Sequence, residues 1–301
     1  MKRMKIGIIG AGSIGLLFAC CLGERHDIYL YCRTEEQAAK IGKEGILLRE
    51  GEREIRCRVR RSAAGYAGED LDCLIVAVKS YHLPALAGEL KKIPGRIPLL
   101  FLQNGMGHLP FLEGLPHRTL ILGSVEHGAM RTEANRLHLK GRGVTRVALF
   151  RGDREFFARL AKGLEVPGFP FLVEDDAEEM LVRKLRVNLI INPLTALLQL
   201  PNGKLAENPD FYQAARKLFD EVFAIFPADG REETFRHVMQ VCRNTAGNRS
   251  SMWKDLAEGR RTEAEAILGY ALEKGKERGI RAPILETLYL LIKGLEREKV
   301  E

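Results

Sequence analysis

The sequence lacks the features that would place it in a membrane, a disulfide-bonded scaffold or a metal centre. It contains one tryptophan and 7% aromatic residues, and no apolar run is long enough to span a membrane. Its six cysteines form no CxxC pair and no Cys/His cluster, so neither a zinc site nor a disulfide framework is expected. We therefore expect a cytoplasmic protein with no metal and no membrane partner.

The distribution of charges along the chain also indicates which class of partner it binds. The net charge is +7, and the basic residues are interleaved with acidic ones rather than clustered. This pattern argues against nucleic acid and favours an anionic small molecule, although an ordinary solvated surface of mixed charge looks the same. Met1 to Lys5 resembles the basic end of a signal peptide, but glycines interrupt the apolar stretch that follows, which indicates a strand and a turn.

A length of 301 residues suggests two domains. Short β-branched apolar segments dominate the first part, and helical periodicity dominates after the acidic run at 174–176. We predict an α/β protein, with a Rossmann-type dinucleotide-binding domain at 1–174 and an all-helical domain at 175–301. The strands are expected at 4–9, 27–31, 45–62, 72–78, 98–102, 120–124 and 146–151, and the later helices at 175–200, 210–226, 231–243, 251–258, 262–278 and 283–297.

A GxGxxG motif joins the first predicted strand to a helix at 14–22. In this context the first glycine allows the tight turn, the second lets a pyrophosphate approach the backbone, and the third permits close packing. Free N–H groups at the start of the helix would hold the phosphates. The predicted cofactor contacts in this motif are Gly10, Gly12, Ser13, Ile14 and Gly15.

Arg33 follows the second predicted strand, where cofactors without a 2′-phosphate usually meet an acidic residue. A guanidinium there suits a bidentate grip on the 2′-phosphate, which predicts NADP(H). The alternative is a solvated surface arginine.

Two more polar residues follow strand ends. Lys79 comes after the strand at 72–78, and Asn104 comes after the strand at 98–102, beside glycines. Ligands of such sheets bind at the carboxyl ends of the strands, so both are candidate cofactor contacts. A surface lysine and a turn asparagine are the alternatives. The segment 125–129 is expected to be a loop in which His127 is a candidate ligand contact.

The most informative segment is the apolar helix that contains Lys184, Asn188 and Asn192. At about 100° per residue, each step of four residues advances by only about 40°, so the three side chains form one polar stripe. Burying them costs several kcal/mol unless a polar group meets them. A ketone substrate would be such a group, and a salt-bridged structural lysine is the alternative for Lys184.

Further polar signals lie at 248–252 and 261–265. Ser250 or Ser251 could simply cap a helix, and Glu263 could simply favour the first turn of one.

Together these motifs resemble the ketopantoate reductase (2-dehydropantoate 2-reductase) family, nearly from end to end. The resemblance rests on Gly10 to Gly15, Val78-Lys79, Asn104 to Gly107 and His127-Gly128, then on Lys184 with Asn188, Asn192 and Asn202, and finally on Asn248 to Met252 and Thr262-Glu263. It implies a nucleotide-binding domain followed by a helical domain of the 6-phosphogluconate dehydrogenase C-terminal type, with the active site in the cleft between them.

The resemblance also implies the reaction and the roles of residues. NADPH would reduce 2-dehydropantoate to (R)-pantoate, a step in pantothenate and coenzyme A biosynthesis, with Lys184 as the general acid. Glu263 would bind the substrate's hydroxyl groups and Ser251 its carboxylate, while Lys79 and Asn104 would serve the cofactor side. Four asparagines would orient the substrate: Asn188, Asn192, Asn202 and Asn248.

Two alternatives stay open. A relative could keep the mechanism and reduce another 2-keto acid, and Glu126 stands where many relatives carry a small hydroxyl residue. The second alternative is a regulator that senses NADPH without catalysis, although such a function would leave Lys184, Glu263 and Ser251 without a role. A homodimer through the helical domain is consistent with the implied fold.

Overall fold

The computed structural model describes residues 3–66 and 68–300. The chain divides into two compact units. The first comprises Met1–Gln103 and Pro110–Met180, and the second comprises Asn104–Leu109 and Leu181–Glu301. The short segment Asn104–Leu109 thus belongs to the second unit, although its sequence neighbours belong to the first.

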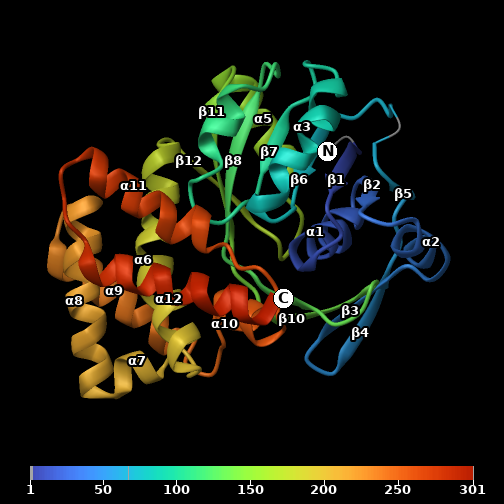
Figure 1. The fold of residues 1–301 in the computed structure, drawn as a ribbon. Coiled ribbons are helices and arrows are strands. Elements are labelled where there is room, and N and C mark those ends of the chain that lie inside the picture. The colour runs from blue at the N-terminus through green and yellow to red at the C-terminus, as the bar shows by residue number, and fades with distance from the viewer. Residues whose placement is uncertain (1–2, 67, 301) are drawn as a thin grey trace. The chain divides into compact units, whose positions relative to one another are not determined.

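The first unit is built on an eight-stranded sheet with the order β12-β11-β8-β7-β6-β1-β2-β5 (Figure 1). Neighbouring strands pair in parallel, except that β11 pairs antiparallel with β8, so β11 and β12 run opposite to the other strands. They span Lys5–Ile9 (β1), Asp27–Cys32 (β2), Arg61–Ala64 (β5), Cys73–Val76 (β6), Leu99–Phe101 (β7), Leu120–Val125 (β8), Thr145–Arg151 (β11) and Phe171–Glu174 (β12). β1, β6 and β7 are short apolar runs because helices or loops cover both faces of the sheet.

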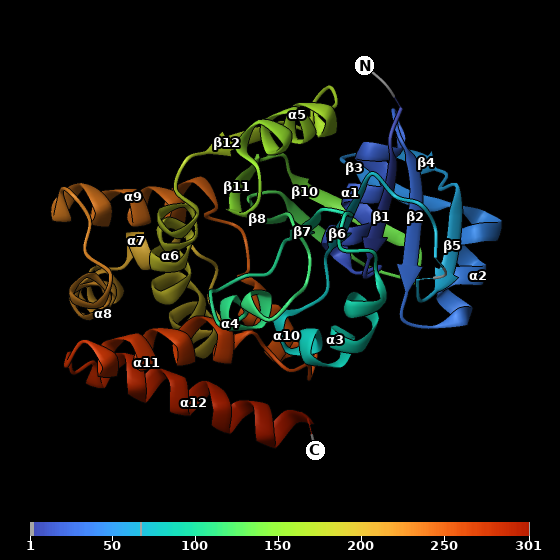
Figure 2. The ribbon, with the colours of Figure 1, turned by 90° about the horizontal axis from the view of Figure 1, so that it is seen from above.

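Helices flank this sheet. They are α1 (Ser13–Gly23), α2 (Glu35–Glu44), the 3-10 turn η1 (Ser80–His82), α3 (Leu83–Lys92), α4 (Leu109–Glu113) and α5 (Arg154–Leu164). Figure 2 shows α3 and α5 on opposite faces of the strands. α1 is almost wholly apolar, and it contributes to one buried cluster together with α5, β1 and β2.

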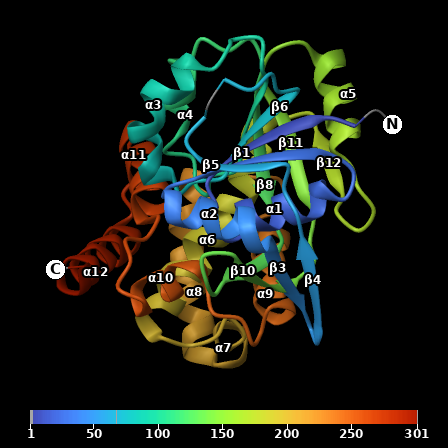
Figure 3. The same ribbon diagram turned by 90° about the vertical axis from the view of Figure 1, so that its right-hand side faces the viewer.

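A second sheet explains why α1 is apolar on nearly all sides. It has the order β4-β3-β10-β9, with β3 (Ile46–Glu50), β4 (Arg53–Cys57), β9 (Gly128–Arg131) and β10 (Arg136–Gly141). α1 contacts both sheets, and Figure 3 shows it between β1 and the β3–β4 hairpin. The prediction of a loop over 125–129 was wrong at both ends, since Val125 ends β8 and Gly128 and Ala129 begin β9.

The second unit is helical. It contains most of α6 (Ala177–Leu198), then α7 (Lys204–Glu207), α8 (Pro209–Ile225), α9 (Arg231–Asn244), α10 (Ser251–Ala257), the π-helical turn η2 (Glu265–Gly269), α11 (Tyr270–Glu277) and α12 (Pro283–Val300). The helix predicted over 262–278 is therefore a π turn that continues into α11. The proposed domain boundary at 174/175 lies just before α6, whereas the two compact units divide within that helix.

All six cysteines are free thiols, and five of them are buried. Burial raises the pKa of Cys21, Cys73 and Cys242 to about 12, so these side chains are unreactive apolar packing residues. No described helix is long and apolar enough to cross a membrane.

Candidate active site

The glycine-rich loop between β1 and α1 has the geometry of a phosphate cradle. Gly10 has φ +104°, which favours glycine. A Cβ at Gly15 would lie 1.7 Å from the carbonyl oxygen of Gly10, so helix and loop can approach only without a side chain. A Cβ at Gly12 would meet nothing within 4 Å, which leaves open space at the start of α1.

The same end of α1 has no competing cap. Gly12 is the N-cap and offers no side-chain acceptor, and the first turn holds no acidic residue. The first N–H groups of the helix therefore remain for an anion, and the positive end of the helix dipole favours one. The loop fits the pyrophosphate of a dinucleotide.

Arg33 directly follows β2 and is exposed. In the part of the chain that the structure describes, its guanidinium makes no hydrogen bond or ion pair. The next residue, Thr34, caps α2 by accepting a hydrogen bond of 3.2 Å from the N–H of Gln37. Arg33 is thus held at the start of a helix with its donors available to a ligand.

Lys79 follows β6 in an extended conformation and is half-buried. The neighbouring backbone is fixed by a residue that the sequence patterns did not single out. Gln103 is 4% exposed, and its Nε2 donates to the carbonyl oxygens of Val76 and Val78, both at 3.0 Å. Gln103 thereby fixes the peptide that leads into Lys79.

In the second unit, α6 carries the predicted polar stripe. Lys184 and Asn188 are half-buried, and Asn192 is 6% exposed. Arg186 lies off the stripe and is 3% exposed. Its Nε and Nη2 donate to the carbonyl oxygens of Phe226 and Pro227, at 2.9 and 2.7 Å, just beyond the carboxyl end of α8.

The carboxyl-terminal part of α6 contacts the loop that precedes α10. The Thr195 hydroxyl donates to Ser250 Oγ at 2.8 Å, and Ser250 Oγ accepts from the Trp253 N–H at 3.2 Å, which caps α10. Ser250 is therefore the capping serine, and Ser251 is exposed at the first position of that helix. The Ser251 hydroxyl is therefore exposed and has no capping role, and its contact with a substrate stays a prediction.

The predicted residues Asn202 and Asn248 come together through the backbone, since the Asn202 N–H donates to the Asn248 carbonyl oxygen at 3.0 Å. The Asn202 side chain is 8% exposed, and its Nδ2 donates to Thr245 Oγ1 at 2.9 Å. Its buried Oδ1 has no partner among the described residues. Thr245 thus fixes the amide of Asn202, and the sequence patterns did not point to it.

Glu263 is 5% exposed and accepts a hydrogen bond from Asn104, with Asn104 Nδ2 at 3.0 Å from Glu263 Oε2. Gly105 makes this approach feasible because a Cβ there would lie 2.1 Å from the Ala266 carbonyl oxygen. The N–H of Met106 donates to that same oxygen at 3.0 Å. Asn104 was predicted on the cofactor side, and the structure shows that its side chain also holds Glu263.

A further network fixes the backbone before Glu263. The Thr262 N–H and hydroxyl both donate to Glu296 Oε1 of α12, at 2.7 and 2.6 Å. Lys293 donates to Glu296 Oε2 at 2.6 Å. Burial raises the pKa of the Glu296 carboxyl, but hydrogen bonds from Lys293 and Thr262 outweigh it and hold that pKa below its usual value. Neither Glu296 nor Lys293 could be linked to Glu263 from sequence, because they lie in the last helix.

His127 and Glu126 have local partners. The His127 ring stacks on Phe169 with centroids 4.4 Å apart, and its Nδ1 accepts from the Gly143 N–H at 3.0 Å. Burial lowers its pKa to about 4, so it is neutral at pH 7. Glu126 is paired with Arg146 at 2.9 Å. No group of three or more His, Cys, Asp or Glu side chains in the described residues could hold a metal ion.

Two family models match the chain. The model described as "Ketopantoate reductase PanE/ApbA" covers residues 6–152, and "Ketopantoate reductase PanE/ApbA C terminal" covers residues 176–296. The chain belongs to the ketopantoate reductase family.

Individual relatives agree with this membership. The chain is 40% identical to a 2-dehydropantoate 2-reductase of Bacillus subtilis, over 98% of both chains. It is 36% identical to that of Listeria innocua, over 99% of both. Among solved structures, the probable 2-dehydropantoate 2-reductase of B. subtilis superposes with a TM-score of 0.87 at 39% identity, over 97% of this chain and 100% of that one.

The fold is also that of a D-mandelate dehydrogenase solved with NADH and anilino(oxo)acetate, with a TM-score of 0.90 at 23% identity, over 98% of this chain and 99% of that one. Family membership confirms the predicted fold class, the oxidoreductase class and the NADP(H) cofactor. The roles of individual residues in this ketopantoate reductase family member are proposals.

Proposed function

We propose that this protein reduces 2-dehydropantoate to (R)-pantoate with NADPH, and that Lys184 is the general acid. The observation that carries the proposal is the polar stripe of α6. Lys184 and Asn188 are half-buried and Asn192 is buried, on a helix whose other buried side chains are apolar except for Arg186 and Thr195, which are hydrogen-bonded within the protein. Buried polar side chains need hydrogen-bonding partners, and the carbonyl, hydroxyl and carboxylate groups of a keto acid are partners that suit a lysine and two amides on one face.

The cofactor residues have separate roles in this proposal. The loop with Gly10, Gly12 and Gly15, together with the first N–H groups of α1 at Ser13 and Ile14, would hold the pyrophosphate. Arg33 would bind the 2′-phosphate, and Lys79 and Asn104 would serve the nicotinamide side. When bound, NADPH supplies the hydride that the ketone carbon accepts.

As the ketone is reduced, negative charge develops on its oxygen. The Lys184 ammonium would stabilise that charge and donate the proton that completes the hydroxyl group. The buried Glu263 carboxylate would accept hydrogen bonds from substrate hydroxyl groups, and the Ser251 hydroxyl would donate to the substrate carboxylate. Asn188, Asn192, Asn202 and Asn248 would orient the keto acid.

The test is NADPH oxidation with 2-dehydropantoate, using the wild type, Lys184→Ala and the neighbouring exposed-position control Arg183→Ala. General acid catalysis contributes roughly a hundred- to ten-thousand-fold, so Lys184→Ala should lose about that factor in kcat. Its Kd for NADPH should stay unchanged, and Arg183→Ala should remain active. A Lys184→Ala protein with near wild-type kcat would overturn the general-acid assignment.

A panel of 2-keto acids, measured in parallel, tests the substrate. The proposal requires 2-dehydropantoate to have the highest kcat/KM. A higher value with another keto acid would reassign the substrate and keep the mechanism. Tight NADPH binding with no turnover of any keto acid would instead support a sensor.

We also propose a cytoplasmic homodimer. α12 exposes two adjacent leucines, Leu290 at 61% and Leu291 at 52%, which suit an intersubunit contact. A structure described as a dimeric ketopantoate reductase of Staphylococcus aureus has the same fold, with a TM-score of 0.81 at 19% identity. Light scattering after size-exclusion chromatography should give twice the chain mass of 33.8 kDa.

A further inference from the structure

The hairpin of β9 and β10 lies against the glycine-rich loop. The N–H of Arg131, the last residue of β9, donates to Ser13 Oγ at 2.9 Å. Its Nη1 donates to the Ala11 carbonyl oxygen at 3.3 Å. These two contacts place a guanidinium beside the loop and the first residue of α1, where the open space next to Gly12 also lies.

Arg131 has donors left for a ligand. The residue is exposed, and only Nη1 of its guanidinium is bonded to the part of the chain that the structure describes. The first turn of α1 has no acidic side chain that would neutralise it. Two positive elements, the start of α1 and this guanidinium, therefore meet at one site.

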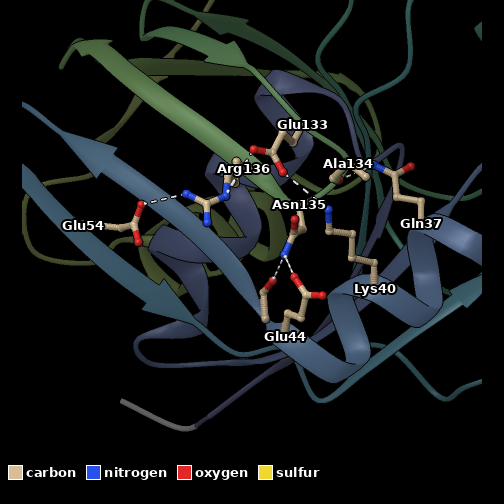
Figure 4. Close-up of polar contacts among 9 residues, drawn as sticks. Gln37, Lys40, Glu44, Glu54, Glu133, Ala134, Asn135 and Arg136 are labelled. Atoms are coloured by element: carbon tan, nitrogen blue, oxygen red, sulfur yellow. Dashed lines mark hydrogen bonds and ion pairs between the residues drawn. The ribbon is translucent and has the colours of Figure 1, made fainter.

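The hairpin is also held firmly in place, as Figure 4 shows. Gln37 Nε2 donates to the Ala134 carbonyl oxygen at 2.7 Å. Asn135 is fully buried, and its Nδ2 donates to Glu44 Oε2 at 3.2 Å and to the Gly45 carbonyl oxygen at 2.9 Å. An arginine on a fixed backbone loses less conformational entropy when it binds an anion than one on a free loop.

We propose that Arg131 is a second cationic contact of the dinucleotide, directed at the pyrophosphate rather than at the 2′-phosphate. This inference rests on the proposed use of NADP(H). It separates two arginines by function: Arg33 selects NADPH over NADH, and Arg131 strengthens the binding of both.

The contact between Arg131 and Ala11 allows a second explanation for a loss of dinucleotide affinity, and the experiment has to exclude it. Its carbonyl oxygen accepts from Arg131 and also from Gln37 Nε2, at 2.9 Å. Arg131 could therefore act only by fixing the loop. Gln37 makes the same kind of contact without a charge and also holds the hairpin through Ala134, so Gln37→Ala reports the loss of both anchoring contacts while the Arg131 charge is kept.

The experiment measures the Kd of NADPH and of NADH, by protein fluorescence or calorimetry, at low and high salt. Arg131→Gln should weaken both dinucleotides by the same factor, about tenfold, as expected for a lost charge-assisted hydrogen bond. Arg33→Gln should weaken NADPH alone. Arg131→Lys should recover part of the lost affinity because it restores the charge.

The matched control is Arg136→Gln, in the next strand of the same hairpin. Arg136 is paired with Glu54 at 3.2 Å and with Glu133 at 3.4 Å, so its loss should leave both Kd values unchanged. Salt should weaken binding less in Arg131→Gln than in the wild type or in Gln37→Ala, because one screened attraction is gone.

Three outcomes would overturn the inference. Arg131→Gln could bind both dinucleotides like the wild type, could lose NADPH affinity alone, or could keep the wild-type salt dependence. In each case the proposed reduction of a keto acid would stand, because it is tested by turnover. A wild-type chain that binds neither dinucleotide would overturn the proposed function and this inference together.

Discussion

Asn104 Nδ2 lies 3.0 Å from Glu263 Oε2, which joins residues 159 positions apart in the sequence. Asn104 reaches this position because Gly105 and Met106 pack on the carbonyl oxygen of Ala266 in the π-helical turn. The side chain proposed to bind the substrate's hydroxyl groups is thus held by one of the residues first expected to serve the cofactor.

We expect Asn104→Ala to lower kcat/KM for the keto acid by about ten- to a hundred-fold. The reason is that a hydrogen bond to a buried charged group contributes roughly 1.5–3 kcal/mol. In Asn104→Ala/Glu263→Ala the two effects should not add, since both single variants break the same contact. Asn244→Ala, at an exposed position of α9, is the control. Strictly additive losses would show that the contact does not contribute to catalysis.

Replacing Gly12 or Gly15 by alanine should affect different properties of the protein, NADPH affinity in one case and stability in the other. At Gly15 the new Cβ would lie 1.7 Å from a backbone oxygen, so Gly15→Ala should destabilise the protein by about 3 kcal/mol or more. At Gly12 nothing lies within 4 Å, so Gly12→Ala should keep its melting temperature. Its methyl group would enter the space proposed for the pyrophosphate, and NADPH affinity should fall roughly tenfold.

Thermal denaturation and NADPH titration of the two proteins check this contrast. Unchanged NADPH affinity in Gly12→Ala would show that the pyrophosphate does not approach the backbone there.

Two of the cations of α6, Arg186 and Lys184, should separate stability from catalysis. Arg186→Met removes the hydrogen bonds to the carbonyl oxygens of Phe226 and Pro227, of which Phe226 is buried, so it should cost about 3 kcal/mol of unfolding free energy. Lys184→Met should lose turnover while unfolding close to the wild-type midpoint. Urea denaturation measures both, with Arg183→Met as the exposed control. Comparable losses of stability in the two variants would support the structural alternative for Lys184.

His108 should make the protein sensitive to acid. It is 3% exposed, and burial lowers its pKa to about 4, against a smaller opposing effect of the Glu263 charge. Between about pH 6.5 and pH 4 the unfolded chain therefore binds a proton that the folded chain does not. The contribution of His108 to stability is complete above pH 6.5 and is lost as the pH falls toward 4, by at most roughly 3 kcal/mol.

Urea denaturation at pH 7 and pH 5 measures this loss. His108→Gln should lose less stability between the two pH values than the wild type does, and His237→Gln, at an exposed position of α9, should behave like the wild type. An unchanged pH dependence in His108→Gln would assign the acid sensitivity to other groups.

Family membership, the α/β class, the helical second half and the cofactor class could all be predicted from the sequence. These features depend on interactions between residues that are close along the chain. The turn after β1 places three glycines within six positions, and the stripe of α6 follows from the four-residue spacing of Lys184, Asn188 and Asn192. Local backbone sterics and helical periodicity decide both.

Only the tertiary structure decided which side chains support the site. Gln103 fixes the peptide before Lys79, Thr262 is bound by Glu296 of the last helix, and Arg131 reaches the glycine-rich loop from a sheet that was not predicted as such. It also showed that Ser250 caps α10 and that Ser251 does not. Amide, hydroxyl and guanidinium groups take whichever partner the fold brings within about 3 Å, and no local pattern records a partner a hundred residues away.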